Sequence, residues 1–205
     1  MELVPASRLT SSQAAQLLEL VTISMQNEPP MVAIDPDSAD HRYVITKWLT
    51  EKRLSGNVAA SYVYLDDTGR VIAHGILSPP GVGAPAPTTL WQRLVSGFIF
   101  APYYIGWTAY RRLQLLMGDF HGAGPDAYML QALAVDPTLR GQGIGTRFVQ
   151  SLLHDALPAG ATVQLFTQVE RNVSFYEKLG FRTIATATTT VEEYSFPNFV
   201  MTATL

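Results

Sequence analysis

The sequence predicts a mixed α/β fold, in which helices pack on one twisted sheet. The expected elements follow the order βααββ, an insert, and then βαβαββ. Hydrophobic residues make up 47% of the 205 residues and charged residues only 15%, so the chain can bury a sizeable core. It contains no internal repeat, and its length fits one domain over residues 1–205.

The chain is expected to begin with a short strand over residues 1–4. A helix follows over 11–26, where apolar residues recur on one face. Thr10 and Gln13 stand three positions apart immediately before this apolar pattern. This spacing predicts a capping box that opens the helix.

A proline-rich loop is expected over residues 27–38. A second helix would be capped near Asp37 or Ser38 and end at Gly56, because glycine favours the left-handed cap. Apolar runs on both sides of the turn 66–69 then predict a β-hairpin.

The C-terminal part alternates strands and helices. A strong strand is expected over 128–135, and a glycine-rich turn separates it from an apolar-periodic helix. A further strand, a short helix ended by Gly180 and two closing strands complete the chain. These elements are expected over 146–157 (helix), 161–167 (strand), 172–180 (helix), 181–190 (strand) and 196–205 (strand).

Composition excludes several classes of protein. The formal net charge of −3 and the pI of about 5.8 argue against a nucleic-acid-binding protein. The chain has no cysteine, which removes disulfides, thiolate metal sites and a cysteine nucleophile, and fits the cytoplasm. The first twelve residues lack a signal-peptide pattern. The apolar stretch Leu94–Tyr110 is shorter than the roughly 20 residues of a spanning helix, and Pro102 and Gly106 interrupt it, so no membrane segment is expected.

Three glycines at alternate positions, Gly141, Gly143 and Gly145, lie between the predicted strand and helix. Free N–H groups and the helix dipole at such a turn form an anion site, and a diphosphate suits it. The stretch lacks the lysine of a P-loop and the spacing of a dinucleotide turn. On this pattern alone, a tight strand-to-helix connection without a ligand remains the alternative.

The run Arg140-Gly141-Gln142-Gly143-Ile144-Gly145, preceded by LAVDP, resembles the acetyl-CoA-binding signature of the GNAT-type N-acetyltransferase superfamily. Residues Asn172 to Phe181 resemble the second motif of that family. The two motifs stand in the family's order, and the resemblance covers about residues 128–183.

This resemblance implies a central twisted mixed sheet of about seven strands, splayed between strands 4 and 5, with a helical insert before strand 4. It also implies that acetyl-CoA is bound chiefly by main-chain groups. The diphosphate would lie on the turn between Arg140 and Thr146, and the pantetheine arm would follow strand 4. The implied cofactor-binding residues are Leu133, Ala134, Val135, Arg140, Gly141, Gln142, Gly143, Ile144, Gly145, Thr146, Asn172 and Tyr176.

Acetyl transfer to an amine needs a base for the amine and an acid for the departing thiolate. Tyr176 matches the tyrosine that in this family often lies near the cofactor sulfur, and it is expected to be the general acid or to contact the cofactor only. Family members often carry the base as a carboxylate on strand 4. Here Gln131 is the only polar side chain of that strand.

The remaining candidates for a side-chain base are Asp119, His121 and Asp126, and His121 has the most suitable ordinary pKa. A water relay or a neutral amine substrate are alternatives. His41, His74 and His154 show no metal-ligand spacing, so no metal is expected.

The insert over residues 79–127 is rich in aromatic residues and longer than a compact fold needs. It is expected to form a lid over an apolar or aromatic amine, a contact between two copies of the chain, or simply core. The resulting hypothesis is a direct N-acetyltransferase acting on a small-molecule amine. A non-catalytic acyl-CoA sensor and an enzyme for a longer acyl donor are the alternatives.

Overall fold

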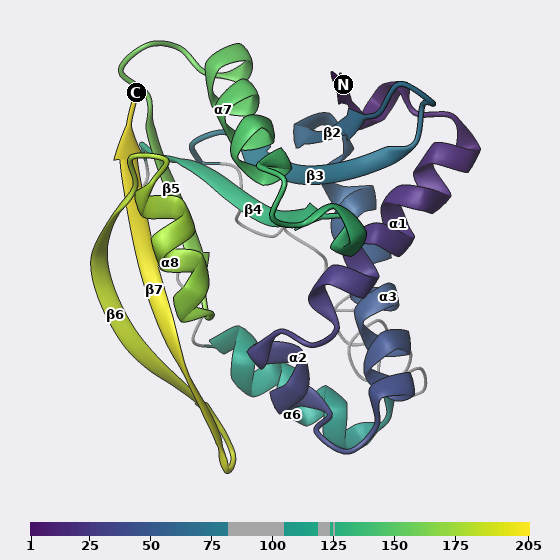
Figure 1. Ribbon diagram of the computed structural model, residues 1–205. Coiled ribbons are helices and arrows are strands. Elements are labelled where there is room, and N and C mark those ends of the chain that lie inside the picture. The colour runs from purple at the N-terminus through teal and green to yellow at the C-terminus, as the bar shows by residue number, and fades with distance from the viewer. Residues whose placement is uncertain (82–104, 119–123, 125) are drawn as a thin grey trace.

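The computed structural model describes residues 1–81, 105–118, 124 and 126–205. These residues form one seven-stranded sheet with helices on both faces, as Figure 1 shows. The strand order is β1-β2-β3-β4-β5-β7-β6. The strands are β1 (Glu2–Pro5), β2 (Ser61–Leu65), β3 (Val71–Ser78), β4 (Tyr128–Val135), β5 (Thr162–Thr167), β6 (Arg182–Val191) and β7 (Tyr194–Thr204).

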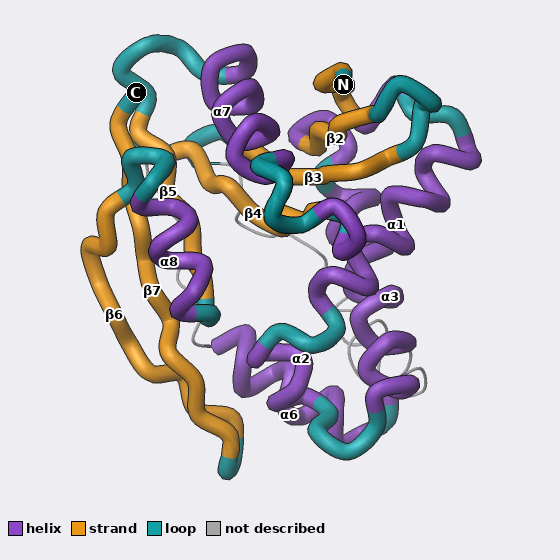
Figure 2. The backbone as a smooth tube through the Cα atoms, viewed as in Figure 1, coloured by secondary structure: helices purple, strands orange, loops and turns teal. Residues whose placement is uncertain are grey.

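Only β4 and β5 run parallel, and every other neighbouring pair in this sheet is antiparallel. Figure 2 shows that the two halves of the sheet, β1 to β4 and β5 to β7, diverge from this parallel pair. The predicted mixed α/β fold with about seven strands is therefore confirmed. The helices are α1 (Ser11–Met25), α2 (Pro29–Ile34), α3 (Ala39–Gly56), α6 (Trp107–Gly118), α7 (Ile144–Ala156) and α8 (Glu170–Glu177).

Local signals in the sequence place the first two predicted helices correctly. The capping box is present: Thr10 Oγ1 accepts from the Gln13 amide at 3.3 Å, and Gln13 Oε1 accepts from the Thr10 amide at 3.0 Å. Ser38 caps α3 by accepting a hydrogen bond from the amide of His41 at 3.1 Å. The hairpin of β2 and β3 also forms as predicted.

The loop predicted over residues 27–38 is partly wrong, because α2 lies within it. Pro29 and Pro30 occupy the first turn of this helix, where a missing N–H costs nothing and the fixed φ of proline suits the helix. Ala33 and Ile34 are buried against α6 and β7. Tertiary packing of this apolar face therefore makes a helix from a stretch that composition marks as a loop.

The main core lies between the sheet and α7. Phe148, Val149 and Leu152 on α7 are fully buried. The ring of Tyr64 on β2 packs edge-on against Phe148, with centroids 5.1 Å apart. On the opposite face, α1 packs on β3 and β4, and its residues Leu17, Leu20 and Val21 form a separate apolar cluster with strand residues.

The described part of the insert contributes to the core. Ile105 and the α6 residues Ala109, Leu113 and Leu116 are buried together with residues of α2, β6 and β7. Trp107 at the start of α6 is 64% exposed. Most of the other aromatic residues of the insert, and most of the apolar stretch 94–110, lie outside the described residues. Within the residues that are described, no helix is both long and apolar enough to cross a membrane.

The packing of α7 on the sheet leaves little room for a side chain at Gly75 on β3. A Cβ at this position would lie 2.9 Å from Cε1 of Phe148, inside ordinary contact distance. We expect Gly75→Ala to lower the free energy of unfolding by about 1–3 kcal/mol, since α7 or the strand must shift. Denaturant unfolding measures this loss.

Gly56→Ala is the matched control, because a Cβ there meets no atom within 4 Å. It should leave stability unchanged or slightly raised, since alanine favours the helix. Equal stability of the two variants would contradict the close approach of Phe148 to β3.

Candidate active site

Strands β4 and β5 separate at the centre of the sheet. Their parallel pairing joins Tyr128, Met129 and Leu130 of β4 to residues 163–165 of β5. β4 continues to Val135 without further pairing on this side. The predicted splay is confirmed, and it leaves main-chain groups of residues 131–135 facing the gap between the strands.

A bulge in β4 accompanies this separation. His74 of β3 pairs with Ala134 and Ile76 pairs with Gln131, so that Ala132 and Leu133 together stand opposite the single residue Gly75. Ala132 has a φ of 50°, in the left-handed region that alanine seldom adopts. A bulge of this kind bends its strand and turns its main-chain groups out of the regular ladder.

The glycine turn lies at the end of β4 and the start of α7. Gly141 has a φ of 78° and Gly143, the N-cap of α7, a φ of 72°. Gly145 lies against β4 and α8: a Cβ there would be in ordinary contact, 3.4 Å from Cγ2 of Val135 and 3.5 Å from Cζ of Phe175. The first turn of α7 therefore lies close to both β4 and α8. Its free N–H groups and helix dipole form an anion site.

Asp136 holds the segment that leads into this turn. Its Oδ1 accepts hydrogen bonds from the amide of Thr138 at 2.8 Å and from the Thr138 hydroxyl at 2.6 Å. Its other oxygen pairs with Arg70 at the start of β3. The carboxylate, only 9% exposed at its side chain, therefore fixes the backbone between β4 and Arg140.

Tyr176 lies on α8, beside this turn. It is 7% exposed, and the rings of Phe175 and Phe181 pack edge-on against it with centroids 5.0 and 5.7 Å away. Burial raises the pKa of its phenol above the ordinary value, and the negative charge of Glu28 adds to this effect. Tyr176 therefore stays protonated at neutral pH.

Asn172, one turn before Tyr176 on α8, donates from Nδ2 to Thr167 Oγ1 at the end of β5 over 3.3 Å. This contact holds the start of α8 against the splayed strand. Asn172 and Tyr176 thus lie on the helix that faces the glycine turn across the contact between Gly145 and Phe175.

Glu28 is a candidate site residue that sequence reasoning missed. It is half-buried at the N-cap of α2, and Arg171, Arg140 and Tyr176 all lie within electrostatic reach of it. Burial raises the pKa of the Glu28 carboxyl, and Arg171 and then Arg140 partly oppose that rise. The turn between α1 and α2, the glycine turn and α8 therefore meet at one place.

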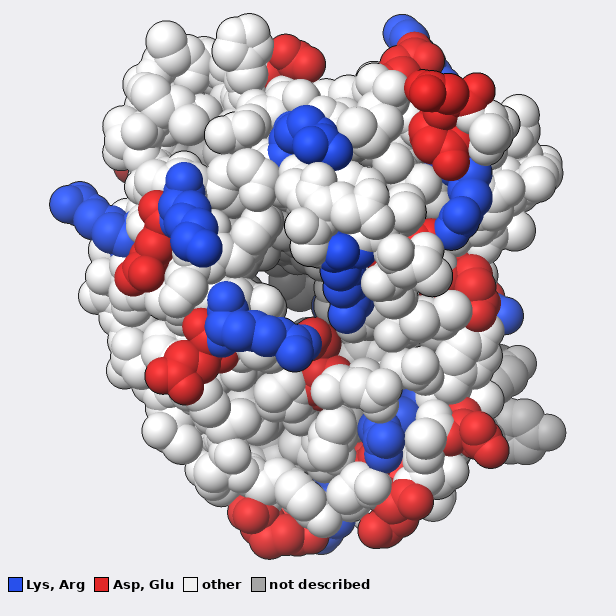
Figure 3. Space-filling model, in the orientation of Figure 1, with Lys and Arg blue, Asp and Glu red and all other residues white. Residues whose placement is uncertain are grey.

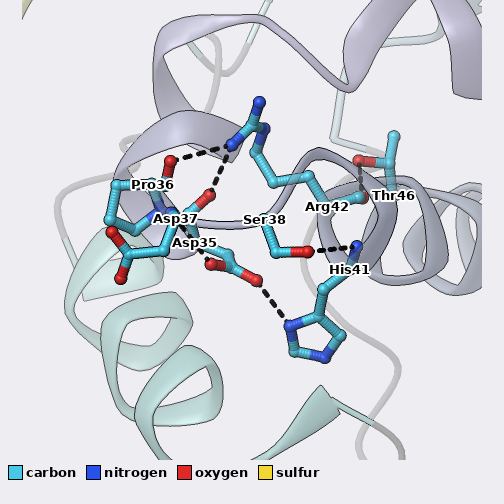
Figure 4. Close-up of polar contacts among 7 residues, drawn as sticks. All are labelled: Asp35, Pro36, Asp37, Ser38, His41, Arg42 and Thr46. Carbon is cyan, nitrogen blue, oxygen red and sulfur yellow. Dashed lines mark hydrogen bonds and ion pairs between the residues drawn. The ribbon is translucent and has the colours of Figure 1, made fainter.

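A cluster of polar contacts, drawn in Figure 4, fixes α2 and hence Glu28. Arg42 on α3 donates from Nη1 to the carbonyl oxygens of Asp35 and Pro36 at 3.0 and 3.1 Å, after the end of α2. Its Nη2 donates to Oδ1 of Asn27 at 3.3 Å, before the start of α2. One guanidinium therefore holds both ends of this short helix.

His41 strengthens the turn between α2 and α3. Its Nδ1 lies 2.5 Å from Oδ2 of Asp35, in the contact that Figure 4 shows below the backbone of α3. Figure 3 shows that this face of the molecule is hollowed near its middle, and that basic and acidic side chains lie around the hollow.

The structure describes only one of the three bases that the sequence offers, and it does not place that one in this group. Asp119 and His121 lie outside the described residues, and Asp126 is exposed in the turn before β4. Nε2 of Gln131 lies 3.5 Å from Oγ of Ser78. His154 is exposed beside Asp155 on α7. Over the described ranges, no group of three or more His, Asp or Glu side chains could hold a metal ion.

The electrostatic grouping around Glu28 predicts how its titration responds to charge removal. Arg171→Met should raise the pKa of Glu28 further, because Arg171 is the cation that favours its ionised form most. NMR titration of ¹³C-labelled glutamate measures this shift, with Glu28→Gln to assign the signal. Arg182→Met on the exposed start of β6 is the control and should leave the Glu28 titration unchanged. The same titration in both variants would show that Arg171 does not face Glu28.

Comparisons with known proteins agree with the fold and with the motifs. The model of the acetyltransferase (GNAT) domain family matches residues 104–183, which include β4, the glycine turn and α8. The peptidyl-lysine N-acetyltransferase YjaB of Salmonella typhimurium is 42% identical over 53 residues. That match covers 26% of this chain and 35% of YjaB, so the chain spans only about a third of that relative's length.

Solved structures extend the likeness to the whole fold. The structure described as histone acetyltransferase HPA2 and related acetyltransferase from Corynebacterium glutamicum superposes with a TM-score of 0.67 and 18% identity, covering 98% of this chain and 93% of that one. A GNAT phosphinothricin acetyltransferase from Sinorhizobium meliloti, solved with AcCoA, gives a TM-score of 0.57 and 16% identity over 100% of this chain and 88% of that one.

At these identities the solved structures show the fold alone. The family match, however, falls on the residues that build the splayed strands, the glycine turn and α8. The family match over residues 104–183, the motif resemblance and the observed architecture therefore agree, and this part of the chain matches the acetyltransferase (GNAT) domain.

Proposed function

We propose that this protein is an N-acetyltransferase that moves the acetyl group of acetyl-CoA directly to the amine of a small molecule. One observation carries the proposal: the opened β4, the glycine turn, Tyr176 and Glu28 come together from separate elements. Direct transfer follows because the chain has no cysteine to carry the acetyl group. The splayed strands provide the cofactor site and the two titratable side chains provide acid and base.

The cofactor site is built mostly from main chain. The amides between Arg140 and Thr146 would hold the diphosphate, with Gly141 and Gly143 allowing close approach. The pantetheine arm would bond the main chain of Leu133, Ala134 and Val135, where β4 has left β5. The remaining residues that line this path are Gln142, Ile144, Gly145, Asn172 and Tyr176. Arg140, at the start of this turn, would supply positive charge beside the diphosphate.

Glu28 takes the place of the carboxylate that β4 lacks. Its raised pKa makes it a better proton acceptor near neutral pH than an ordinary carboxylate, so it would deprotonate the attacking amine directly or through one water. Tyr176, kept protonated by burial, would donate its proton to the sulfur as the carbon–sulfur bond breaks. Bound acetyl-CoA supplies the acetyl group and the thiolate leaving group. His121, which lies outside the described residues, remains the alternative base.

We further propose that residues 1–205 form one domain, because strands from both ends of the chain share one sheet. The proposed acceptor is a small amine. A nucleic acid is disfavoured, because the formal net charge is −3 and no basic face is expected. No metal takes part in this scheme, and a location in the cytoplasm fits the cysteine-free sequence.

A thermal-melt titration with acetyl-CoA tests the cofactor site. At 100 times its dissociation constant the ligand should add about 2.7 kcal/mol to the stability of the wild type. Gly143→Asp should abolish this gain, because its side chain would enter the diphosphate site with a negative charge.

Gly160→Asp provides the matched control. Gly160 has a φ of 80°, so the substitution carries the same backbone strain, but it lies between α7 and β5. This variant should melt lower than the wild type and still gain stability from acetyl-CoA. If the wild type itself gains nothing, the glycine turn is only a connection and the proposed function is wrong.

Steady-state kinetics with an amine that the protein acetylates test the proposed acid and base. Glu28→Gln should lower kcat about 10²- to 10⁴-fold and remove the acidic limb of the pH profile, because the base must be ionised to work. Tyr176→Phe should lower kcat without a comparable change in acetyl-CoA affinity. Stopped assays of free CoA across pH values measure both effects.

Glu170→Gln on the exposed start of α8 is the control and should keep the wild-type profile. A wild type that binds acetyl-CoA but releases no CoA with any amine would identify a sensor instead of an enzyme. A preference for longer acyl-CoA molecules would leave the proposed mechanism standing and identify a longer acyl-CoA as the donor.

A further inference from the structure

His74 is the most deeply buried imidazole among the described residues, and it contacts the bulge of β4. It lies on β3 and is 0% exposed. Its Nδ1 is 3.1 Å from the carbonyl oxygen of Ala132, the residue with the left-handed φ of 50°. A carbonyl oxygen can only accept, so Nδ1 carries the proton and donates it.

The bulge creates a need for this donor. Because Ala132 and Leu133 share one opposing residue, Gly75, the regular ladder between β3 and β4 cannot satisfy every main-chain group there. A carbonyl that loses its ladder partner near the core needs another donor. The imidazole of His74 supplies this donor, because His74 pairs with Ala134 directly beside the bulge.

The bulge is also held from the other face of the sheet. Successive residues of a strand point to opposite faces, and Gly75 faces α7, where Cε1 of Phe148 approaches closely. Phe148 therefore limits movement of β3 on one face while His74 anchors the Ala132 carbonyl on the other. The conformation of Leu133, Ala134 and Val135 follows from this fixed point.

We propose that His74 is a positioning residue for acetyl-CoA: its Nδ1–H holds the Ala132 carbonyl and thereby sets the main chain of Leu133 to Val135 that receives the pantetheine arm. This inference rests on the proposed function. His74 itself does not touch the cofactor in this scheme, and its effect passes through the backbone of β4.

Two further features fit this role. Burial lowers the pKa of His74 to about 4, so the imidazole is neutral at pH 7 and needs no counter-ion; the Ala132 hydrogen bond opposes this shift and the charge of Arg53 adds to it. Its Nε2 is buried and has no hydrogen-bond partner within the described parts of the chain. Only Nδ1 therefore anchors the ring by a hydrogen bond.

Asparagine can imitate that single contact, because its amide nitrogen is attached to Cγ just as Nδ1 is. The test compares His74→Asn with His74→Leu by calorimetric titration with acetyl-CoA and by steady-state kinetics. His74→Leu should raise the Kd and the KM for acetyl-CoA about tenfold, with kcat at saturation nearly unchanged. His74→Asn should restore both constants to within about twofold of the wild type.

His154→Leu on the exposed face of α7 is the control for loss of a histidine and should leave the Kd unchanged. Equal binding by wild type and His74→Leu would overturn the inference and leave the proposed function standing. Equal loss in the Leu and Asn variants would also overturn it, because a packing role would then explain both. No binding by the wild type would overturn the proposed function and this inference together.

A measurement on the wild type covers the case in which His74→Leu does not fold. Long-range ¹H–¹⁵N spectra of the imidazoles should show His74 as the Nδ1–H tautomer, and its signals should shift when acetyl-CoA is added. A proton on Nε2, or an Nδ1 signal that does not respond to bound acetyl-CoA, would overturn the inference.

Discussion

The early end of pairing between β4 and β5 is the constraint on which the rest of the structure depends. Three residue pairs join the halves of the sheet, and beyond Leu130 the strands separate. A parallel pair at the centre of a sheet is normally buried and fully hydrogen-bonded. Here the separation leaves residues 131–135 of β4 without a partner on β5, and the glycine turn follows directly after β4. The bulge at Ala132 and the left-handed glycines are the local conditions that make this separation tolerable.

The two halves of the chain supply different parts of the site. The C-terminal half contributes β4, the glycine turn and α8, and its residues would bind the cofactor mainly through backbone atoms. The N-terminal half contributes Glu28, and Arg42 fixes its helix by bonding to residues on either side of α2. Burial acts on both ionisable groups in the same direction: it raises the pKa of Glu28 and that of Tyr176. The same burial therefore favours the protonated form of both side chains.

Much of the fold could be predicted because its signals are local. The capping box at Thr10, the cap at Ser38 and the alternation of strands and helices after Tyr128 all depend on neighbours within a few residues. The glycine turn could be located for the same reason. Glu28 could not, because its approach to Tyr176 arises from packing between elements far apart in the sequence. The pair Glu28–Pro29, an acidic residue before a proline that can open a helix, is the signal that could have placed α2. Nothing in residues 128–135 marks the bulge, since they contain no glycine.

A site held by backbone atoms has a consequence for how such a protein can change over generations. Main-chain amides persist whatever side chain replaces their neighbours, so the region of Leu133 to Val135 can tolerate sequence drift that preserves its bend. The turn between α2 and α3 is different, because Arg42 and Asp35 hold it through particular side chains. Substitutions in that turn would re-aim α2 and Glu28 while the glycine turn stays as it is. The two sides of the candidate site therefore differ in how they respond to substitution.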